Sequence, residues 1–233
     1  MVSAGMAGIV ATLSRNSAHG LDSVPAERCA DVLGMTGVAV TVLTPGAAGE
    51  VIWRSDGASA RLDDLHVTLG EGPAVDAATS GELVLESDLA AVPWQRWPAF
   101  TPAAIELGVR AVFAIPMQIG AIRLGVLLAH RNVPGPMGDG SLADALAFVS
   151  AATGALLGPA TTQLDVPQWF AEQPTGYTAQ IHQATGMISV QLGVKQADAM
   201  IRMRAHAFGQ CRVLADVAAD VLARRLRFDK DAK

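Results

Sequence analysis

The sequence predicts an α+β domain built on an antiparallel sheet, followed by a small all-α bundle of three helices. Short β-branched runs occur in pairs separated by turn residues over the first 131 residues, which favours hairpins. Beyond residue 160 no strand period recurs, and apolar residues return at helical spacing. With 233 residues, 51% of them hydrophobic, the chain is long enough for one large domain or two small ones.

Five strands are expected in the first part. Residues 37–44 are β-branched, and the turn chemistry of residues 45–49 leads into a second run at 50–56, which predicts a hairpin. Three further strand candidates are 82–88, 110–119 and 121–131. Only Gly120 separates the last two, so we expect them to pair antiparallel.

Helices are expected around these strands, at residues 26–35, 73–80, 98–107 and 142–157. Together the strands and helices define a domain over residues 26–160, preceded by a partly helical N-terminal extension at 1–25. An antiparallel sheet with helices packed on it is the α+β arrangement. Residues 161–174, with turn-prone residues around an aromatic pair, are expected to be a linker.

The last part is expected to fold as three short amphipathic helices over residues 175–228, followed by a tail at 229–233. The first runs from about 178 to 192 and ends at Gly193, a typical C-terminal cap. The second runs from about 195 to 208. In the third, apolar residues from Leu214 recur at helical spacing, with acids early and arginines late, which suits the helix dipole.

Charge is distributed unevenly along the chain. The net charge is −5, but residues 1–160 carry −7 with no lysine, whereas residues 175–228 carry +4. A basic segment on an acidic protein favours a polyanionic partner. The longest apolar runs are much shorter than the roughly 20 residues of a membrane helix, and the N-terminus lacks a secretory pattern. We therefore expect a cytoplasmic protein with no membrane partner.

Two residues of the last part call for an explanation. Gly186 lies in the middle of an expected helix, where glycine costs roughly 1 kcal/mol relative to alanine, so some group is expected to approach the backbone there. Arg204 lies at the edge of an apolar stripe. Either its aliphatic stem lies along the apolar surface with the charged group in water, or its guanidinium contacts an anion.

Cys29 and Cys211 lie far apart outside any metal-binding spacing and are expected to be reduced thiols.

An ordered set of fragments in the last part resembles an ANTAR domain: Gln183-Ala-Thr-Gly-Met187, Leu192-Gly-Val194, Arg202-Met-Arg-Ala-His-Ala207 and Leu214-Ala-Asp-Val-Ala218. The resemblance implies a three-helix module that binds paired RNA hairpins in nascent transcripts, prevents termination and usually acts as a dimer under an attached sensor. It assigns RNA binding to Gln183, Ala184, Thr185, Gly186, Arg202, Arg204 and His206. Thr185 stands where the family commonly has lysine, which removes a phosphate charge or replaces it by a hydroxyl.

The preceding part resembles a GAF domain, through the two hairpins and through Leu69-Gly-Glu-Gly-Pro73, Glu86-Ser-Asp-Leu89, Trp97-Pro-Ala-Phe100 and Leu107–Pro116. This resemblance implies a domain that senses a signal or dimerises, and it names no cofactor. Aromatic side chains are candidates for an apolar ligand pocket, with core packing as the alternative: Trp53, Trp94, Trp97, Phe100 and Phe113. His66 and His130 are lone histidines without metal-binding spacing.

The two resemblances together predict a signal-responsive, RNA-binding transcription antitermination regulator. Its expected partners are hairpin RNA, a second copy of the chain and a small-molecule ligand of the GAF-like domain. No Ser/His/Asp order or carboxylate pair indicates an enzyme. The alternative is a ligand-binding dimerisation protein whose helical tail assembles subunits without nucleic acid. A DNA-binding helix-turn-helix is disfavoured, because no helix carries a polar recognition face.

Overall fold

The computed structural model of the chain describes residues 1–43, 49–157, 177–210 and 212–228. Five strands form one sheet in the order β2-β1-β5-β4-β3, and every neighbouring pair is antiparallel. The strands are β1 (Gly37–Val42), β2 (Glu50–Arg54), β3 (Val84–Glu86), β4 (Ala111–Ile119) and β5 (Ile122–Arg131). The predicted antiparallel sheet and both predicted hairpins are therefore confirmed, and Gly120 turns the second one with a φ of 57°.

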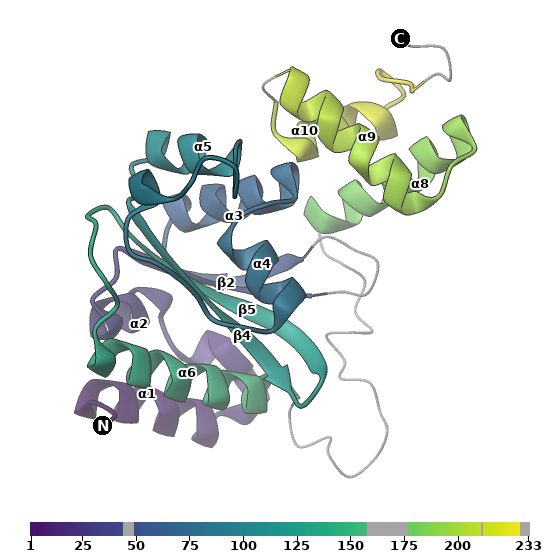
Figure 1. The fold of residues 1–233 in the computed structure, drawn as a ribbon. Helices are drawn as coiled ribbons and strands as arrows, with labels where there is room; N and C mark the ends of the chain where they lie inside the picture. Colours follow the sequence, from purple (N-terminus) through teal and green to yellow (C-terminus); the bar gives the residue numbers. More distant parts are fainter. Residues whose placement is uncertain (44–48, 158–176, 211, 229–233) are drawn as a thin grey trace.

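Helices cover both faces of the sheet (Figure 1). One face carries α1 (Ala4–Arg15), the 3-10 helix η1 (Ser17–Ser23), α2 (Ala26–Leu33) and α6 (Asp139–Leu157). The other carries α3 (Gly57–Leu69), α4 (Pro73–Ser80), η2 (Leu89–Ala91) and α5 (Phe100–Glu106). In strand β4, Phe113 and Ile115 face the first layer and Val112 and Ala114 face the second. Because both faces are buried, the strand reads as a continuous apolar run rather than an alternation.

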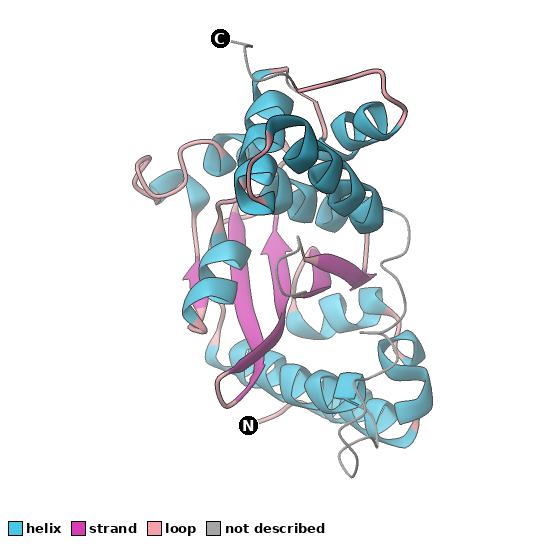
Figure 2. Cartoon of the chain, turned by 90° about the vertical axis from the view of Figure 1, so that its right-hand side faces the viewer, coloured by secondary structure: helices cyan, strands magenta, loops and turns pink. Residues whose placement is uncertain are grey.

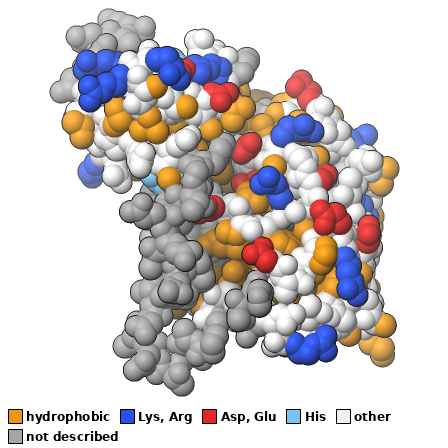
Figure 3. All heavy atoms as spheres, turned by 180° about the vertical axis from the view of Figure 1, so that it is seen from behind, with side chains coloured by type: hydrophobic (Ala, Val, Ile, Leu, Met, Phe, Trp, Pro, Cys, Tyr) orange, Lys and Arg blue, Asp and Glu red, His pale blue; other side chains and the backbone are white. Residues whose placement is uncertain are grey.

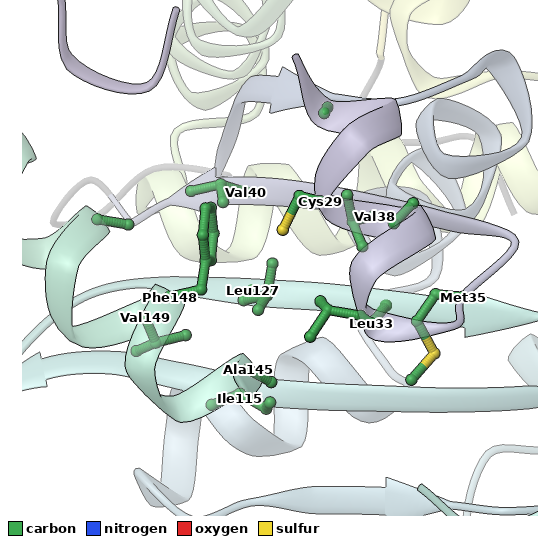
Figure 4. Close-up of a cluster of buried hydrophobic side chains, with 14 of the residues drawn as sticks. Cys29, Leu33, Met35, Val38, Val40, Ile115, Leu127, Ala145, Phe148 and Val149 are labelled. Atoms are coloured by element: carbon green, nitrogen blue, oxygen red, sulfur yellow. The ribbon is translucent and has the colours of Figure 1, made fainter. Parts of the chain in front are cut away.

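The core on the α1 side includes residues from the very start of the chain. Met6, Ile9 and Leu13 are fully buried in it, and the backbone N–H of Ser3 donates to Asp144 Oδ1 at 2.7 Å. Figure 4 shows how α2 and α6 meet strands β1, β4 and β5 in this core. The first 25 residues, expected as an extension, thus include part of the helical layer itself.

Helix α6 is, within the described ranges, the one helix long and apolar enough by length and composition to cross a membrane. Its side chains Ala145, Phe148 and Ala152 are fully buried in the same cluster as the sheet residues. The core of this domain therefore accounts for the hydropathy of α6.

Helix α3 is an element that the sequence did not predict. Asp56 caps it by accepting a hydrogen bond from the Ser59 N–H at 2.7 Å, and Gly70 ends it with a φ of 69°. Four of its buried residues are polar: Ser59, Asp63, His66 and Thr68. Such a helix has no regular apolar stripe, because it packs on the sheet on one side and on the C-terminal helices on another.

The C-terminal part consists of α8 (Tyr177–Leu192), α9 (Gln196–Gly209) and α10 (Leu214–Leu222). These helices share one hydrophobic cluster, which also takes in Val67 of α3. Figure 2 shows them stacked at one end of the molecule, beyond the strands. Gly193 ends α8 with a φ of 65°, as its predicted capping role requires. The predicted linker at 161–174 and tail at 229–233 lie outside the described residues.

Candidate functional site

A surface groove of about 870 Å³ runs across α8 and the end of α10. Its lining combines two arginines, two amides and small or apolar groups: Gln183, Gly186, Met187, Val190, Gln191, Leu222, Arg224 and Arg227. None of the described residues that line it is acidic. Figure 3 shows Lys and Arg side chains gathered over this bundle, whereas basic and acidic side chains mix over the sheet domain. The groove therefore offers a positive, hydrogen-bonding surface.

Gly186 lies in this groove and faces outward. A Cβ atom built on Gly186 would meet no heavy atom within 4 Å. Close packing by a neighbouring helix is therefore not the reason for glycine at this position. The open backbone forms part of the groove wall, where an incoming molecule can approach it directly.

The arginines of the groove come from the segment that follows α10. Arg224 adopts a φ of 58°, which is uncommon for a residue with a side chain and turns the chain back toward α8. The Phe228 N–H then donates to Gln191 Oε1 at 3.0 Å, which fixes this segment against α8. Arg224 and Arg227 are exposed and form no ion pair with any described residue.

Arg225, which lies between these two arginines in the sequence, does have an ion-pair partner. Arg225 donates to Asp220 Oδ1 at 2.8 Å, and Arg212 donates to Asp220 Oδ2 at 2.6 Å. Both guanidinium groups lower the pKa of the Asp220 carboxyl. Asp220 thus forms ion pairs with two of the bundle's arginines. Arg224 and Arg227 are not bound to it and remain available to a partner.

The residues that the ANTAR resemblance assigns to RNA binding lie in several places. Gln183 and Gly186 line the groove. Ala184 and Thr185 face the bundle core, and the Thr185 hydroxyl donates to the Ile181 carbonyl at 2.6 Å, so neither side chain reaches the groove. Arg224 and Arg227 were expected as part of the basic charge and as the basic end of the third helix. The structure ends α10 at Leu222, so both lie beyond the helix, in a segment whose fold was not predictable.

Helix α9 carries the other three residues of that set. Arg202 is exposed, and the ring of His206 lies 5.4 Å from that of Phe228, in an edge-on contact. Arg204 is half-buried, and its Nε donates to the carbonyl oxygen of Val67 at 2.8 Å. Burial lowers the pKa of Arg204. Arg204 therefore contacts the sheet domain, at a helix C-terminus whose carbonyls attract a cation.

A second hollow, of about 150 Å³, lies between α3, α4 and the sheet. Inside it the Thr41 hydroxyl donates to Asp63 Oδ1 at 2.6 Å, and burial raises the pKa of the Asp63 carboxyl to about 6. His66 also lines it, with Nδ1 placed 2.8 Å from the Leu62 carbonyl and Nε2 buried without a partner among the described residues. Burial lowers the pKa of His66 to about 4, so the ring is neutral at pH 7. Arg204 forms another part of the wall.

The aromatic side chains predicted for a ligand pocket do not converge. Trp53 stacks on Phe148 at 5.1 Å in the core on the α1 side, where Phe113 also lies. Trp97 and Phe100 pack together on the opposite face of the sheet, with ring centroids 6.0 Å apart. Trp94 is 72% exposed. None of the five lines the 150 Å³ cavity, so the alternative of core packing describes all of them except Trp94.

A Ser-His-Asp cluster, with the serine and histidine buried and the aspartate partly exposed, forms next to strand β1, although its geometry is not that of a hydrolase. Ser59 Oγ lies 3.1 Å and Asp56 Oδ1 lies 3.9 Å from the same nitrogen, Nε2 of His130. A catalytic triad needs the carboxylate on the other ring nitrogen, and His130 Nδ1 is buried without a partner among the described residues. Ser59 is itself only 1% exposed. The cluster caps α3 and fixes it to the sheet.

Other reactive groups are isolated. Burial raises the pKa of the Cys29 thiol to about 12, which keeps it protonated. Cys211 lies outside the described residues. Within the part of the chain that the structure describes, no group of three or more His, Cys, Asp or Glu side chains could hold a metal ion.

No protein-family model matches the sequence. No curated protein matches it either. Solved structures do resemble it: the GAF domain of a phosphoenolpyruvate-protein phosphotransferase from Acinetobacter superposes with a TM-score of 0.52 and 14% identity, over 69% of this chain and 96% of that one. At this identity the likeness shows the fold alone. The sheet and its two helical layers therefore have the GAF fold that the sequence predicted.

Two further neighbours are also GAF domains. One, from a phosphoenolpyruvate-protein phosphotransferase of Coxiella burnetii, has a TM-score of 0.49 and 13% identity, over 65% of this chain and 93% of that one. The other is the phycoerythrobilin-bound GAF domain of a cyanobacterial phytochrome, with a TM-score of 0.48 and 13% identity, over 66% of this chain and 95% of that one.

Proposed function

We propose that the chain is a signal-responsive regulator whose C-terminal bundle binds hairpin RNA and whose GAF-fold domain senses the signal. The observation that carries this proposal is the groove that combines the open backbone of Gly186 with Arg224 and Arg227, which have no ion-pair partner among the described residues. The resemblance of the same segment to an ANTAR domain supports RNA as the polyanion, and antitermination as the outcome of binding.

The groove supplies the two kinds of contact that RNA recognition uses. Arginine side chains neutralise phosphates and set the affinity and its salt dependence. Amide groups such as those of Gln183 and Gln191 can donate to and accept from the edges of unpaired bases, which is how proteins read RNA loops. A bare glycine between them lets a sugar or base lie against the helix backbone.

Replacement of Gly186 by alanine is expected to raise the stability of the bundle and to lower its affinity for RNA. With nothing near the new Cβ, Gly186→Ala should stabilise the bundle by about 1 kcal/mol, because alanine is the better helix former. The same methyl group enters the groove and should weaken RNA binding by roughly 10-fold, the effect of about 1.4 kcal/mol. Urea unfolding and an electrophoretic mobility shift assay with a two-hairpin RNA measure the two effects.

The matched control is Gly154→Ala in α6, where a Cβ would also meet nothing within 4 Å. It should give a similar gain in stability with unchanged RNA affinity. If Gly186→Ala binds the RNA as tightly as the unaltered chain, the groove is not the binding surface. If no paired-hairpin RNA binds in a salt-dependent way, the RNA-binding function is wrong.

A second candidate function is subunit assembly through the bundle without nucleic acid. Exposed apolar side chains on the bundle favour it: Val190 is 84%, Ile201 61% and Phe208 59% exposed. The two functions are compatible if a dimer presents two grooves to two hairpins. Native mass spectrometry with and without the RNA distinguishes them, since assembly alone gives a dimer that retains no RNA.

A further inference from the structure

The bundle contacts the GAF-fold domain through the last turn of α3. Val67 contributes its side chain to the hydrophobic cluster of the bundle and its carbonyl oxygen to Arg204 Nε. Gly70 follows in the left-handed conformation, and a Cβ there would lie 2.7 Å from Arg204 Nη1. The guanidinium therefore rests on a glycine that leaves room for it.

The hydrogen bond between the Arg204 guanidinium and the Val67 carbonyl can be replaced by a stronger one. Arg204 is half-buried, yet it forms no ion pair with any described residue, and among these residues its hydrogen-bond partner is a neutral backbone carbonyl. A carboxylate or a phosphate binds a guanidinium more strongly than a neutral carbonyl does. While the bundle contacts α3, the hydrogen-bonding capacity of the Arg204 guanidinium is therefore used only in part.

Arg204 also separates two hollows. On one side it lines the 150 Å³ cavity that contains Asp63 and His66. On the other it lines a cleft of about 410 Å³ between the two domains, together with Gly70 and Phe208. Any molecule that fills the cavity touches the same guanidinium that fixes the bundle to α3.

We infer that Arg204 is a latch: occupation of the cavity under α3 displaces its guanidinium from the Val67 carbonyl and releases α9 from the GAF-fold domain. This inference rests on the proposed function in one respect, since release exposes the Arg204 guanidinium to solvent, where it adds a phosphate contact. The coupling needs no long pathway, because one helix carries His66 toward the cavity and the Val67 carbonyl toward the bundle.

Two variants test the latch without a substitution in the helices of the bundle. Val67→Ser weakens docking from the α3 side, and Ala78→Met fills the cavity from α4 without any ligand. Both should raise hydrogen exchange in peptides of α9 and in the last turn of α3. Both should also tighten RNA binding by about fivefold and steepen its salt dependence by about one phosphate contact.

Two controls accompany them. Ala90→Met, at an exposed site away from the cavity, should change neither the hydrogen exchange of α9 nor the affinity for RNA. Arg204→Gln should raise exchange in α9 but not tighten RNA binding, because the released cation is missing. This variant also replaces Val67→Ser as the test of docking if that protein does not fold.

Unchanged exchange in α9 for both Arg204→Gln and Ala78→Met would overturn the latch. If Ala78→Met raises hydrogen exchange in α9 but weakens RNA binding, release of α9 does not favour RNA binding, and that part of the inference is wrong. If the unaltered chain binds no RNA, the proposed function fails, while the exchange measurements still decide whether the cavity controls docking.

Discussion

Asp63→Asn is expected to stabilise the protein at pH 7 by about 2 to 3 kcal/mol and to change the pH dependence of its stability. Burial raises the pKa of the Asp63 carboxyl from 3.8 to about 6, so at pH 7 the folded protein holds an ionised carboxylate in an unfavourable place. A shift of roughly two units corresponds to about 3 kcal/mol. Asparagine keeps an oxygen that can accept from the Thr41 hydroxyl, which Asp63 does at 2.6 Å.

The sign of the pH effect follows from proton binding. Between pH 4 and 6 the folded state holds the Asp63 proton while the unfolded state releases it, so this group lowers stability as pH rises. His66, whose pKa burial lowers from 6.5 to about 4, has the opposite effect, because the unfolded state holds the extra proton. In the unaltered chain the two effects oppose each other. Asp63→Asn leaves only that of His66, and its stability should rise steeply from pH 4 to 6.5.

Urea unfolding at pH 4.5 and at pH 7 measures this difference. Asp31→Asn, at an exposed position, is the matched control and should shift stability by less than about 0.5 kcal/mol at either pH. A variant Asp63→Asn that is less stable than the unaltered chain at pH 7 would contradict the expectation. That outcome would mean that the hydrogen bond from Thr41 to the ionised carboxylate outweighs the cost of its burial.

The double variant Arg224→Ala, Arg227→Ala is expected to weaken RNA binding by roughly 100-fold at physiological salt. Both guanidinium groups line the groove and have no ion-pair partner among the described residues, so each is free to neutralise one phosphate. Loss of two phosphate contacts should reduce the slope of log affinity against log salt by about 1.4 to 1.8. A mobility shift titration at several salt concentrations gives both numbers.

Arg225→Ala is the control for this variant, because it removes one positive charge from the same segment. Its guanidinium is bound to the carboxylate of Asp220, which keeps it from the groove. The control should therefore leave the affinity within about threefold, a difference of under 1 kcal/mol. A loss of about tenfold for Arg225→Ala, half of the double variant's loss in binding free energy, would show that net charge, rather than the groove, governs binding.

Much of the GAF-fold domain was predictable from local signals. Helix α4 occupies the expected residues 73–80, because Pro73 starts it and Gly81 ends it in the left-handed conformation. Helix α3 escaped prediction, because its buried side is half polar and carries no apolar period. Its capping Asp56 and terminal Gly70 were the available signals. The sequence also could not assign Trp53 and Trp97 to opposite faces of the sheet, since both faces are buried.

The candidate site was predictable only in part. Gly186 was identified from its helix cost, and the structure shows that it faces the solvent side. Arg224 and Arg227 were not, because their placement depends on the turn at Arg224 and on a hydrogen bond between Phe228 and Gln191, 37 residues apart. Arg204 meets Val67 across 137 residues, a contact that no local pattern encodes.

The packing of α1 determines where the chain can be shortened. A truncated protein that starts at residue 26 would keep every strand of the sheet but lose Met6, Ile9 and Leu13. Their partners on α6 would then be left facing water as a continuous apolar surface, of the kind that makes proteins associate nonspecifically. Expression of the GAF-fold domain in soluble, monodisperse form should therefore depend on retaining the first helix.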